Sequence, residues 1–204
     1  MTGSAPALRR ILGRRAPPGH GAELLHCELC GAPVADMHRH LLDERSGAPL
    51  CVCHPCTVLF DRPAAGGDHY RLIPDRRVRM APFPTKGLGV PVGLAYLVAQ
   101  PDGVVVANYP NPLGSTHYEV EPQQWRDVVG QRPELDGLAP TVEAVLINTV
   151  HGAEQHWIVP IDDCYRLVAI IRTHWRGLSG GNEVWPAIDA FFDELPRGNR
   201  HFGI

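Results

Sequence analysis

The cysteines of this chain gather in two short stretches whose spacing suits a metal site. Five of the six cysteines fall between residues 27 and 56, and they include two C-x-x-C pairs, Cys27/Cys30 and Cys53/Cys56. Each C-x-x-C forms a tight turn that directs two sulfurs to one point, and a Zn²⁺ ion about 2.3 Å from each sulfur joins two such turns. Residues 31–52 separate the pairs, a gap slightly longer than the usual length of about 15–20 residues. We therefore predict a four-thiolate metal site on Cys27, Cys30, Cys53 and Cys56.

Two identities are open for the metal at this site. A closed set of four thiolates leaves no position for substrate or water, which favours a structural Zn²⁺. The alternative is rubredoxin-like iron or an iron-sulfur cluster, because two C-x-x-C turns also suit iron and the stretch holds one thiol more than zinc requires. We expect the extra donors, Cys51 and His54, to stay outside the metal's coordination, where His54 can donate a hydrogen bond to a thiolate.

His38 and His40 alternate along a predicted strand, so both side chains point to one face. This spacing would suit a second, looser metal site. Surface polarity explains the two histidines as well, and it is the interpretation that the sequence favours.

The sixth cysteine, Cys164, falls on the apolar face of a predicted helix, where a free thiol behaves as a small hydrophobe. The alternative is a thiol nucleophile, with a general base among His151, His156 and His174. No motif fixes the geometry of such a pair, so the sequence does not favour an enzyme.

Two further features near the C-terminus have simple structural interpretations. Asp162 is expected to be a helix N-cap and Asp163 a first-turn charge, rather than a catalytic carboxylate pair. Gly180 and Gly181 precede Asn182 and are expected to form a turn between helices, although backbone N–H groups at a helix start also bind anions.

The elements that must position these residues form two groups. Residues 24–60 predict a small module with a strand near residues 37–43, a hairpin end at residues 46–49 and a short helix or strand after Cys56. The following extended segments predict strands, and those at 92–98, 104–109 and 116–120 read as a three-stranded meander. The remaining strand candidates are residues 70–74, 77–80, 142–148 and 156–161.

Three helices are predicted after the meander. A short one spans residues 122–129, with Pro122 in its first turn. A second spans residues 163–176, because Cys164, Leu167, Val168, Ile171 and Trp175 recur at helical spacing. A third starts after Asn182 and carries an apolar stripe through Leu195. The expected fold is α+β: a zinc-ribbon-like module followed by an antiparallel sheet packed by two C-terminal helices.

Composition limits the class of protein. The chain has 204 residues, 44% hydrophobic and 20% charged, which is typical of a globular protein with a real core. The basic residues form no dense patch and the net charge is -3, so nucleic-acid binding is not expected. No run of 18 apolar residues and no signal-peptide pattern is present, which predicts a cytoplasmic protein without a membrane span. Reduced thiols in that compartment favour a metal over disulfides.

The expected domains are a flexible arm at 1–23, a Cys-rich metal-binding module at 24–80 and an α+β domain at 90–198. The Cys27-to-Phe60 module, together with the block from Val159 through Asp162, Cys164 and His174–Gly181 to Trp185, resembles an uncharacterised bacterial family encoded beside [NiFe]-hydrogenase genes. The resemblance implies an accessory role in hydrogenase assembly or electron transfer, with a hydrogenase subunit or maturation factor as partner. The resemblance assigns no catalytic residue to this chain.

Overall fold

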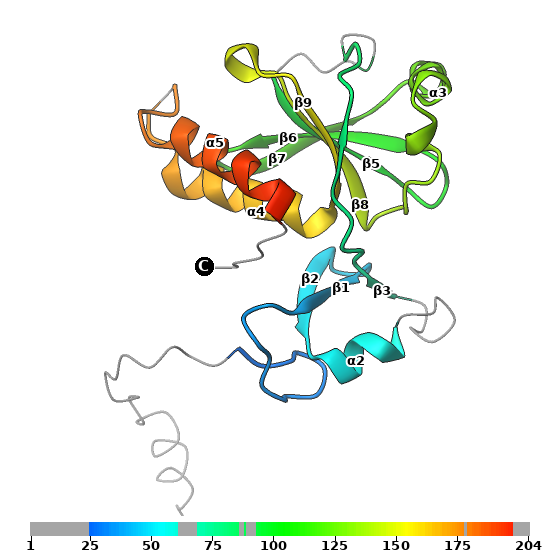
Figure 1. Ribbon diagram of the computed structural model, residues 1–204, viewed down its shortest axis with the longest axis vertical. Helices are drawn as coiled ribbons and strands as arrows, with labels where there is room; N and C mark the ends of the chain where they lie inside the picture. Colours follow the sequence, from blue (N-terminus) through cyan, green and yellow to red (C-terminus); the bar gives the residue numbers. More distant parts are fainter. Residues whose placement is uncertain (1–24, 61–68, 86–87, 89–92, 178, 198–204) are drawn as a thin grey trace, which may run out of the picture.

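The computed structural model describes residues 25–60, 69–85, 88, 93–177 and 179–197, and the predicted arm lies outside these residues. The described chain forms a small N-terminal lobe beside a larger sheet-and-helix lobe (Figure 1). The small lobe holds a three-stranded sheet in the order β2-β1-β3 and one short helix. Its elements are β1 (Arg39–Asp43), β2 (Ala48–Val52), β3 (Tyr70–Leu72) and α2 (His54–Leu59).

The hairpin of the small lobe turns where the sequence predicts it. β1 and β2 pair antiparallel, with Asp43 opposite Ala48. The Asp43 carboxylate accepts hydrogen bonds from the Arg45 backbone N–H and the Ser46 hydroxyl, a side-chain to backbone pattern that stabilises tight turns. Gly47 has a φ of 69°, a conformation that glycine adopts at no steric cost. This turn sets the register that brings the two cysteine pairs together.

The larger lobe is built on a six-stranded antiparallel sheet in the order β4-β9-β8-β5-β6-β7. The predicted meander is confirmed as β5-β6-β7, three neighbouring strands in chain order. β4 pairs with β9 at the edge of this sheet. The residues of β4 fall within the range 24–80 that the sequence predicts for the metal module. The strands are β4 (Val78–Met80), β5 (Leu94–Ala99), β6 (Val105–Asn111), β7 (Gly114–Glu119), β8 (Glu143–Asn148) and β9 (Gln155–Pro160).

Alternate residues of the central strands pack into two separate cores, one on each face of the sheet. Tyr96 and Leu146 belong to the core beneath α4 (Ile161–His174) and α5 (Val184–Glu194). Leu97 and Ile147 belong to the core on the opposite face, which includes residues of α3 (Pro122–Gln131). All six residues of β8 are buried because both faces of this central strand are covered. Three single-turn 3-10 helices complete the described elements: η3 (Pro133–Leu135), η4 (Val150–Gly152) and η5 (Leu195–Arg197).

The α+β class, the four-cysteine module and the antiparallel sheet packed by two C-terminal helices are therefore confirmed. The expected helix caps are wrong. α4 begins at Ile161 after Pro160, so Asp162 lies inside the first turn. α5 begins at Val184 after Glu183 rather than directly after Asn182. Neither helix start has a side-chain capping hydrogen bond, and the Asp162 carboxylate instead lies 2.9 Å from His40 Nδ1.

Residues 73–77 connect the two lobes and are held by two ion pairs. The Arg76 guanidinium donates to both carboxylate oxygens of Glu143, at 2.8 and 2.9 Å. Arg77 does the same to Asp163, at 2.6 and 3.1 Å. Both carboxylates are almost fully buried. Because a two-pronged pair has a fixed planar geometry, these contacts set the orientation of the connecting segment on the larger lobe.

Candidate metal centre

The four cysteines predicted from sequence spacing converge in the small lobe. The sulfurs of Cys27, Cys30, Cys53 and Cys56 all lie within 4.8 Å of one another. The Sγ atoms of Cys30 and Cys53 are 3.6 Å apart. Tetrahedral bonds of about 2.3 Å place thiolates about 3.8 Å apart, so these separations fit one ion at the centre of the group. No disulfide joins the described cysteines, so the four sulfurs of this group are not tied up in disulfide bonds.

The first pair sits in a turn closed by backbone hydrogen bonds. The Gly31 N–H donates to the Cys27 carbonyl at 2.8 Å, and the Cys27 N–H donates to the Ala32 carbonyl at 2.7 Å. Gly31 has a φ of 74°, and this left-handed residue directly after the second cysteine lets the chain double back. The turn buries Cys27 and leaves Cys30 exposed.

The second pair is positioned by the start of α2. Cys53 is the N-cap residue, and Cys56 lies in the first helical turn after Pro55. Proline suits this place because its missing N–H would have no helical partner there. The helix geometry holds Cys53 and Cys56 close together. Both are buried in one cluster with Cys27 of the first cysteine pair.

The electrostatics of the group favour a cation. Burial raises the pKa of Cys27, but hydrogen bonds from the backbone N–H groups of Cys53, Cys30 and Leu29 outweigh it and bring that pKa to about 6. The neighbouring Cys53 thiol, together with burial, raises the pKa of Cys56 to about 12. The Cys27 thiol is thus readily ionised, whereas the Cys56 thiol nearby resists ionisation. A positive ion removes this conflict because it stabilises all four thiolates at once.

The two extra donors in the stretch lie in different places. Cys51 is half-buried on β2 and lies outside the four-sulfur group. Burial, and the charges of Glu28 and Cys27, raise its pKa. His54 is exposed at the start of α2. Both residues therefore lie outside the four-sulfur group, and their absence from the coordination of a metal stays a prediction.

The interpretation of His38 and His40 as surface residues is wrong for His40. That side chain is 2% exposed, and its Nδ1 lies 2.9 Å from Asp162 Oδ2 at the start of α4. His38 and His40 instead form a second donor group with Cys51, whose ligand atoms lie within 4.8 Å of one another. Asp162, expected to be a cap, is a buried partner of this group.

Cys164 is not suited to nucleophilic chemistry. It is fully buried in the core beneath α4 and α5. Burial, with the charges of Asp163 and Asp162, raises its pKa well above the ordinary value, which keeps the thiol protonated. The reactive form of cysteine is the thiolate, so the structure supports the interpretation of Cys164 as a small hydrophobic residue.

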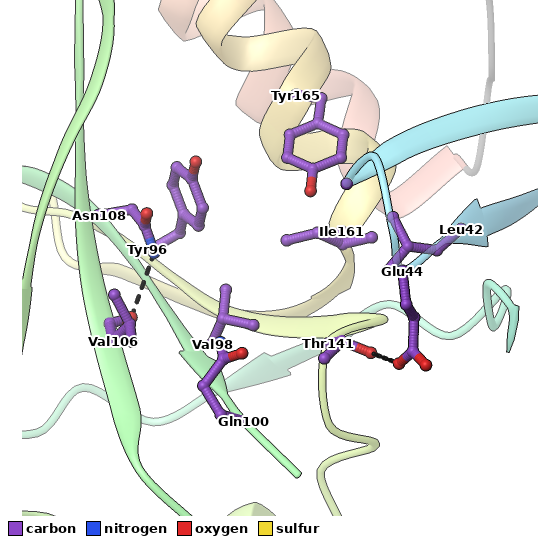
Figure 2. Close-up of a pocket in the computed structure, with 11 residues that line it drawn as sticks. Leu42, Glu44, Tyr96, Val98, Gln100, Val106, Asn108, Thr141, Ile161 and Tyr165 are labelled. Carbon is purple, nitrogen blue, oxygen red and sulfur yellow. Dashed lines mark hydrogen bonds between the residues drawn. The ribbon is translucent and has the colours of Figure 1, made fainter. Parts of the chain in front are cut away.

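A cleft of 260 Å³ lies between the two lobes (Figure 2). The hairpin contributes Leu42 and Glu44, the sheet contributes Tyr96 and α4 contributes Tyr165. The Thr141 hydroxyl lies 2.9 Å from Glu44 Oε1 across the cleft. Burial raises the pKa of both tyrosines, so their phenols stay neutral. Such a lining can donate and accept hydrogen bonds but holds no pair of carboxylates for acid–base catalysis.

Sequence reasoning missed the buried pairs at the junction of the lobes. His40 and Asp162 are 122 positions apart, and Arg77 and Asp163 are 86 apart. The available signal was a charged residue next to an apolar run, as at Asp163, because such a residue is rarely buried without a partner. That signal indicates that a partner exists but does not say which one.

These features define an α+β protein with a four-cysteine group that can hold a metal ion. Residues 26–199 match the family described as Family of unknown function (DUF5947), and the chain belongs to that family. No curated protein and no solved structure matches the chain. Among the described residues, no helix has the length and apolar character needed to cross a membrane.

Proposed function

We propose that this chain is a metal-binding accessory protein of the cytoplasm, in which one Zn²⁺ on Cys27, Cys30, Cys53 and Cys56 folds the N-terminal module. The convergence of the four sulfurs carries this proposal. A set of four thiolates is complete without water or substrate, which is the pattern of structural rather than catalytic zinc. The small lobe has few buried apolar side chains besides the cysteines, so the metal supplies much of its folding free energy.

The role in a complex rests on the surface of the same module. Leu25, Met37, Val58 and Leu59 are large apolar side chains that are 41–61% exposed, and all belong to the small lobe. Exposed apolar groups that lie together form protein-binding surfaces, and we propose that these four contribute to one. The resemblance to proteins encoded beside [NiFe]-hydrogenase genes makes a hydrogenase subunit or maturation factor the proposed partner.

The metal part of the proposal is tested by replacing one ligand. Cys27→Ser should reduce tightly bound zinc by one equivalent and unfold the small lobe, measured by metal analysis and hydrogen exchange. Cys164→Ala, which removes a thiol outside the group, is the matched control and should keep its zinc. A Cys27→Ser protein with unchanged metal content would contradict the assignment.

The partner part is tested on α2. Leu59→Asp places a charge at an exposed apolar position and should weaken binding to purified hydrogenase subunits or maturation factors at least tenfold. Leu113→Asp is the control, because Leu113 is 95% exposed at the β6–β7 turn of the other lobe. Equal binding by both variants, or no binding by the wild type, would reject this partner class.

The second candidate function is electron transfer through a rubredoxin-like iron on the same cysteines. Cys30 is exposed and would give electrons a short path to the surface, while backbone N–H groups hydrogen-bond to Cys27. Both exposure and such hydrogen bonds tune the potential of iron–thiolate sites. The sulfur separations support a single iron rather than a cluster, because the thiolates of a cluster bind different irons and lie further apart. Anaerobically prepared protein would then be coloured and bleach on reduction, whereas colourless protein with zinc alone would dismiss this function.

A further inference from the structure

A second group of metal-binding side chains lies on the hairpin, next to the four-cysteine group. His40 and Cys51 are directly opposite each other in the β1–β2 register, and His38 precedes His40 by two residues. The imidazole rings of His38 and His40 have centroids 4.7 Å apart. The three ligand atoms lie within 4.8 Å of one another. The cross-strand pairing puts His40 and Cys51 on one face of the sheet, and His38 lies directly before β1.

The hydrogen bonds of the two histidines fix the tautomer that a metal requires. His38 Nδ1 lies 2.9 Å from the Ala35 carbonyl oxygen, which can only accept, so Nδ1 carries the proton. His40 Nδ1 lies 2.9 Å from the Asp162 carboxylate, which favours the proton on Nδ1 in the same way. The lone electron pair of each ring therefore lies on Nε2. The His38 Nε2 is buried and has no hydrogen-bond partner among the described residues.

The pairing of His40 with Asp162 has the form of a carboxylate–histidine–metal triad. Histidines that bind metals almost always donate their other N–H to a carboxylate or a backbone carbonyl, which orients the ring and raises its basicity. His40 has the carboxylate and His38 has the carbonyl. A histidine that only clamped the hairpin to α4 would account for the His40–Asp162 contact. It would not account for the orientation of His38 or for the adjacent thiol of Cys51.

We infer that His38, His40 and Cys51 form a second site for a divalent borderline metal ion, Zn²⁺ in the first instance, with its fourth position open to water or a ligand. Zn–N and Zn–S bonds of about 2.0 and 2.3 Å place such donors on the order of 3.3–3.7 Å apart. The donor atoms must therefore move about 1 Å closer together when the ion binds. His38 and Cys51 can make this movement because both are only half-buried. His38 also lines a cavity of 330 Å³ beside Met37 and His54, which gives the ion a route.

This site differs in kind from the four-cysteine site. It has three protein ligands instead of four, and its histidine partner Asp162 belongs to the other lobe. Open three-ligand zinc sites are those that exchange ions or carry reactions. An ion here would also link the hairpin to the first turn of α4, and so would stiffen the junction between the lobes.

The proposal is tested by counting zinc in the full chain at equilibrium with buffered Zn²⁺. The wild type should bind two equivalents, whereas His38→Ala and Cys51→Ser should each bind one. His117→Ala is the control, because His117 is exposed on β7 outside both groups, and it should bind two. One equivalent in the wild type, or two in His38→Ala, would overturn the second site.

The role of Asp162 is tested separately, because His40 is buried and its replacement can disturb folding. Asp162→Asn should leave the four-cysteine site occupied and weaken the second site by about 10- to 100-fold, measured by competition with a chromophoric chelator. An unchanged zinc affinity would mean that Asp162 is only a structural partner of His40, and would overturn the triad. A wild type that binds one equivalent, which Cys56→Ser loses, would mean failure of this inference alone, whereas a wild type that binds no zinc would mean failure of the proposed function.

Discussion

The individual thiols of this chain have distinct roles that follow from where they lie. Cys164 is enclosed by the core beneath two helices, whereas Cys30 is exposed on the first turn of the metal module. The same residue type is therefore a packing group at one position and a proposed ligand at the other. Reactivity toward alkylating reagents should follow this division.

Cys164 should resist iodoacetamide in the folded protein, because burial keeps it protonated and inaccessible. Cys30 should be modified once a chelator has removed the metal, and it serves as the internal control. Peptide mass spectrometry after brief labelling measures both. Rapid modification of Cys164 in the native protein would revive the thiol-enzyme hypothesis.

His156 should make the larger lobe sensitive to acid. It is 2% exposed on β9, and burial, with the charge of Arg132, lowers its pKa. The unfolded chain, with a histidine pKa of about 6.5, binds the proton first as pH falls. Stability is therefore lost as pH drops below about 6.5, by at most about 1.4 kcal/mol per pH unit.

Urea unfolding followed by tryptophan fluorescence at pH 7.5 and 5.5 measures this loss. His156→Gln cannot take up the proton and should show a smaller difference between the two pH values. The same difference in both proteins would assign the acid sensitivity to other groups.

At the scale of the elements, the C-x-x-C spacing, the meander and the apolar faces of α4 and α5 could be predicted because each is local. The predicted site residues Cys27, Cys30, Cys53 and Cys56 meet for the same reason: two short turns and one hairpin bring them together. The junction pairs could not be predicted. They depend on how two lobes pack, and no periodicity in the sequence records that packing.

Removing Arg77 should be costly because it leaves the buried Asp163 carboxylate without its partner. We expect Arg77→Met to lower the free energy of unfolding by about 3–5 kcal/mol. The double variant Arg77→Met/Asp163→Leu removes both charges and should recover most of that loss. Chemical denaturation measures each value.

Arg172→Met is the control for this series, because Arg172 is exposed on α4 and its loss should change stability by no more than about 0.5 kcal/mol. A double variant no more stable than Arg77→Met would show that the pair does not act through the buried charge.

At the scale of the whole molecule, the two lobes rest on different sources of stability. The larger lobe has two apolar cores on the faces of one sheet, while the small lobe has one small cluster that includes three cysteines of the four-sulfur group. If the proposed metal binds, a lobe of that size should depend on it more than on buried apolar area.

Chelation should therefore unfold the small lobe and leave the larger one folded. All four tryptophans fall between residues 125 and 185, so their fluorescence should stay unchanged while residues 25–60 lose protection against hydrogen exchange. Readdition of Zn²⁺ should restore protection. Parallel loss of tryptophan signal would mean that the lobes fold as one unit.

The most direct test of the central claim is X-ray absorption at the metal edge, on protein prepared without oxygen and carrying His38→Ala and Cys51→Ser so that only the four-cysteine site remains. We predict one equivalent of zinc with four sulfur neighbours at about 2.3 Å. Iron with four sulfur neighbours would confirm the four-cysteine site but would favour the electron-transfer function over a structural zinc. Fewer than four sulfurs, or no metal, would contradict the convergence of the four cysteines on one ion.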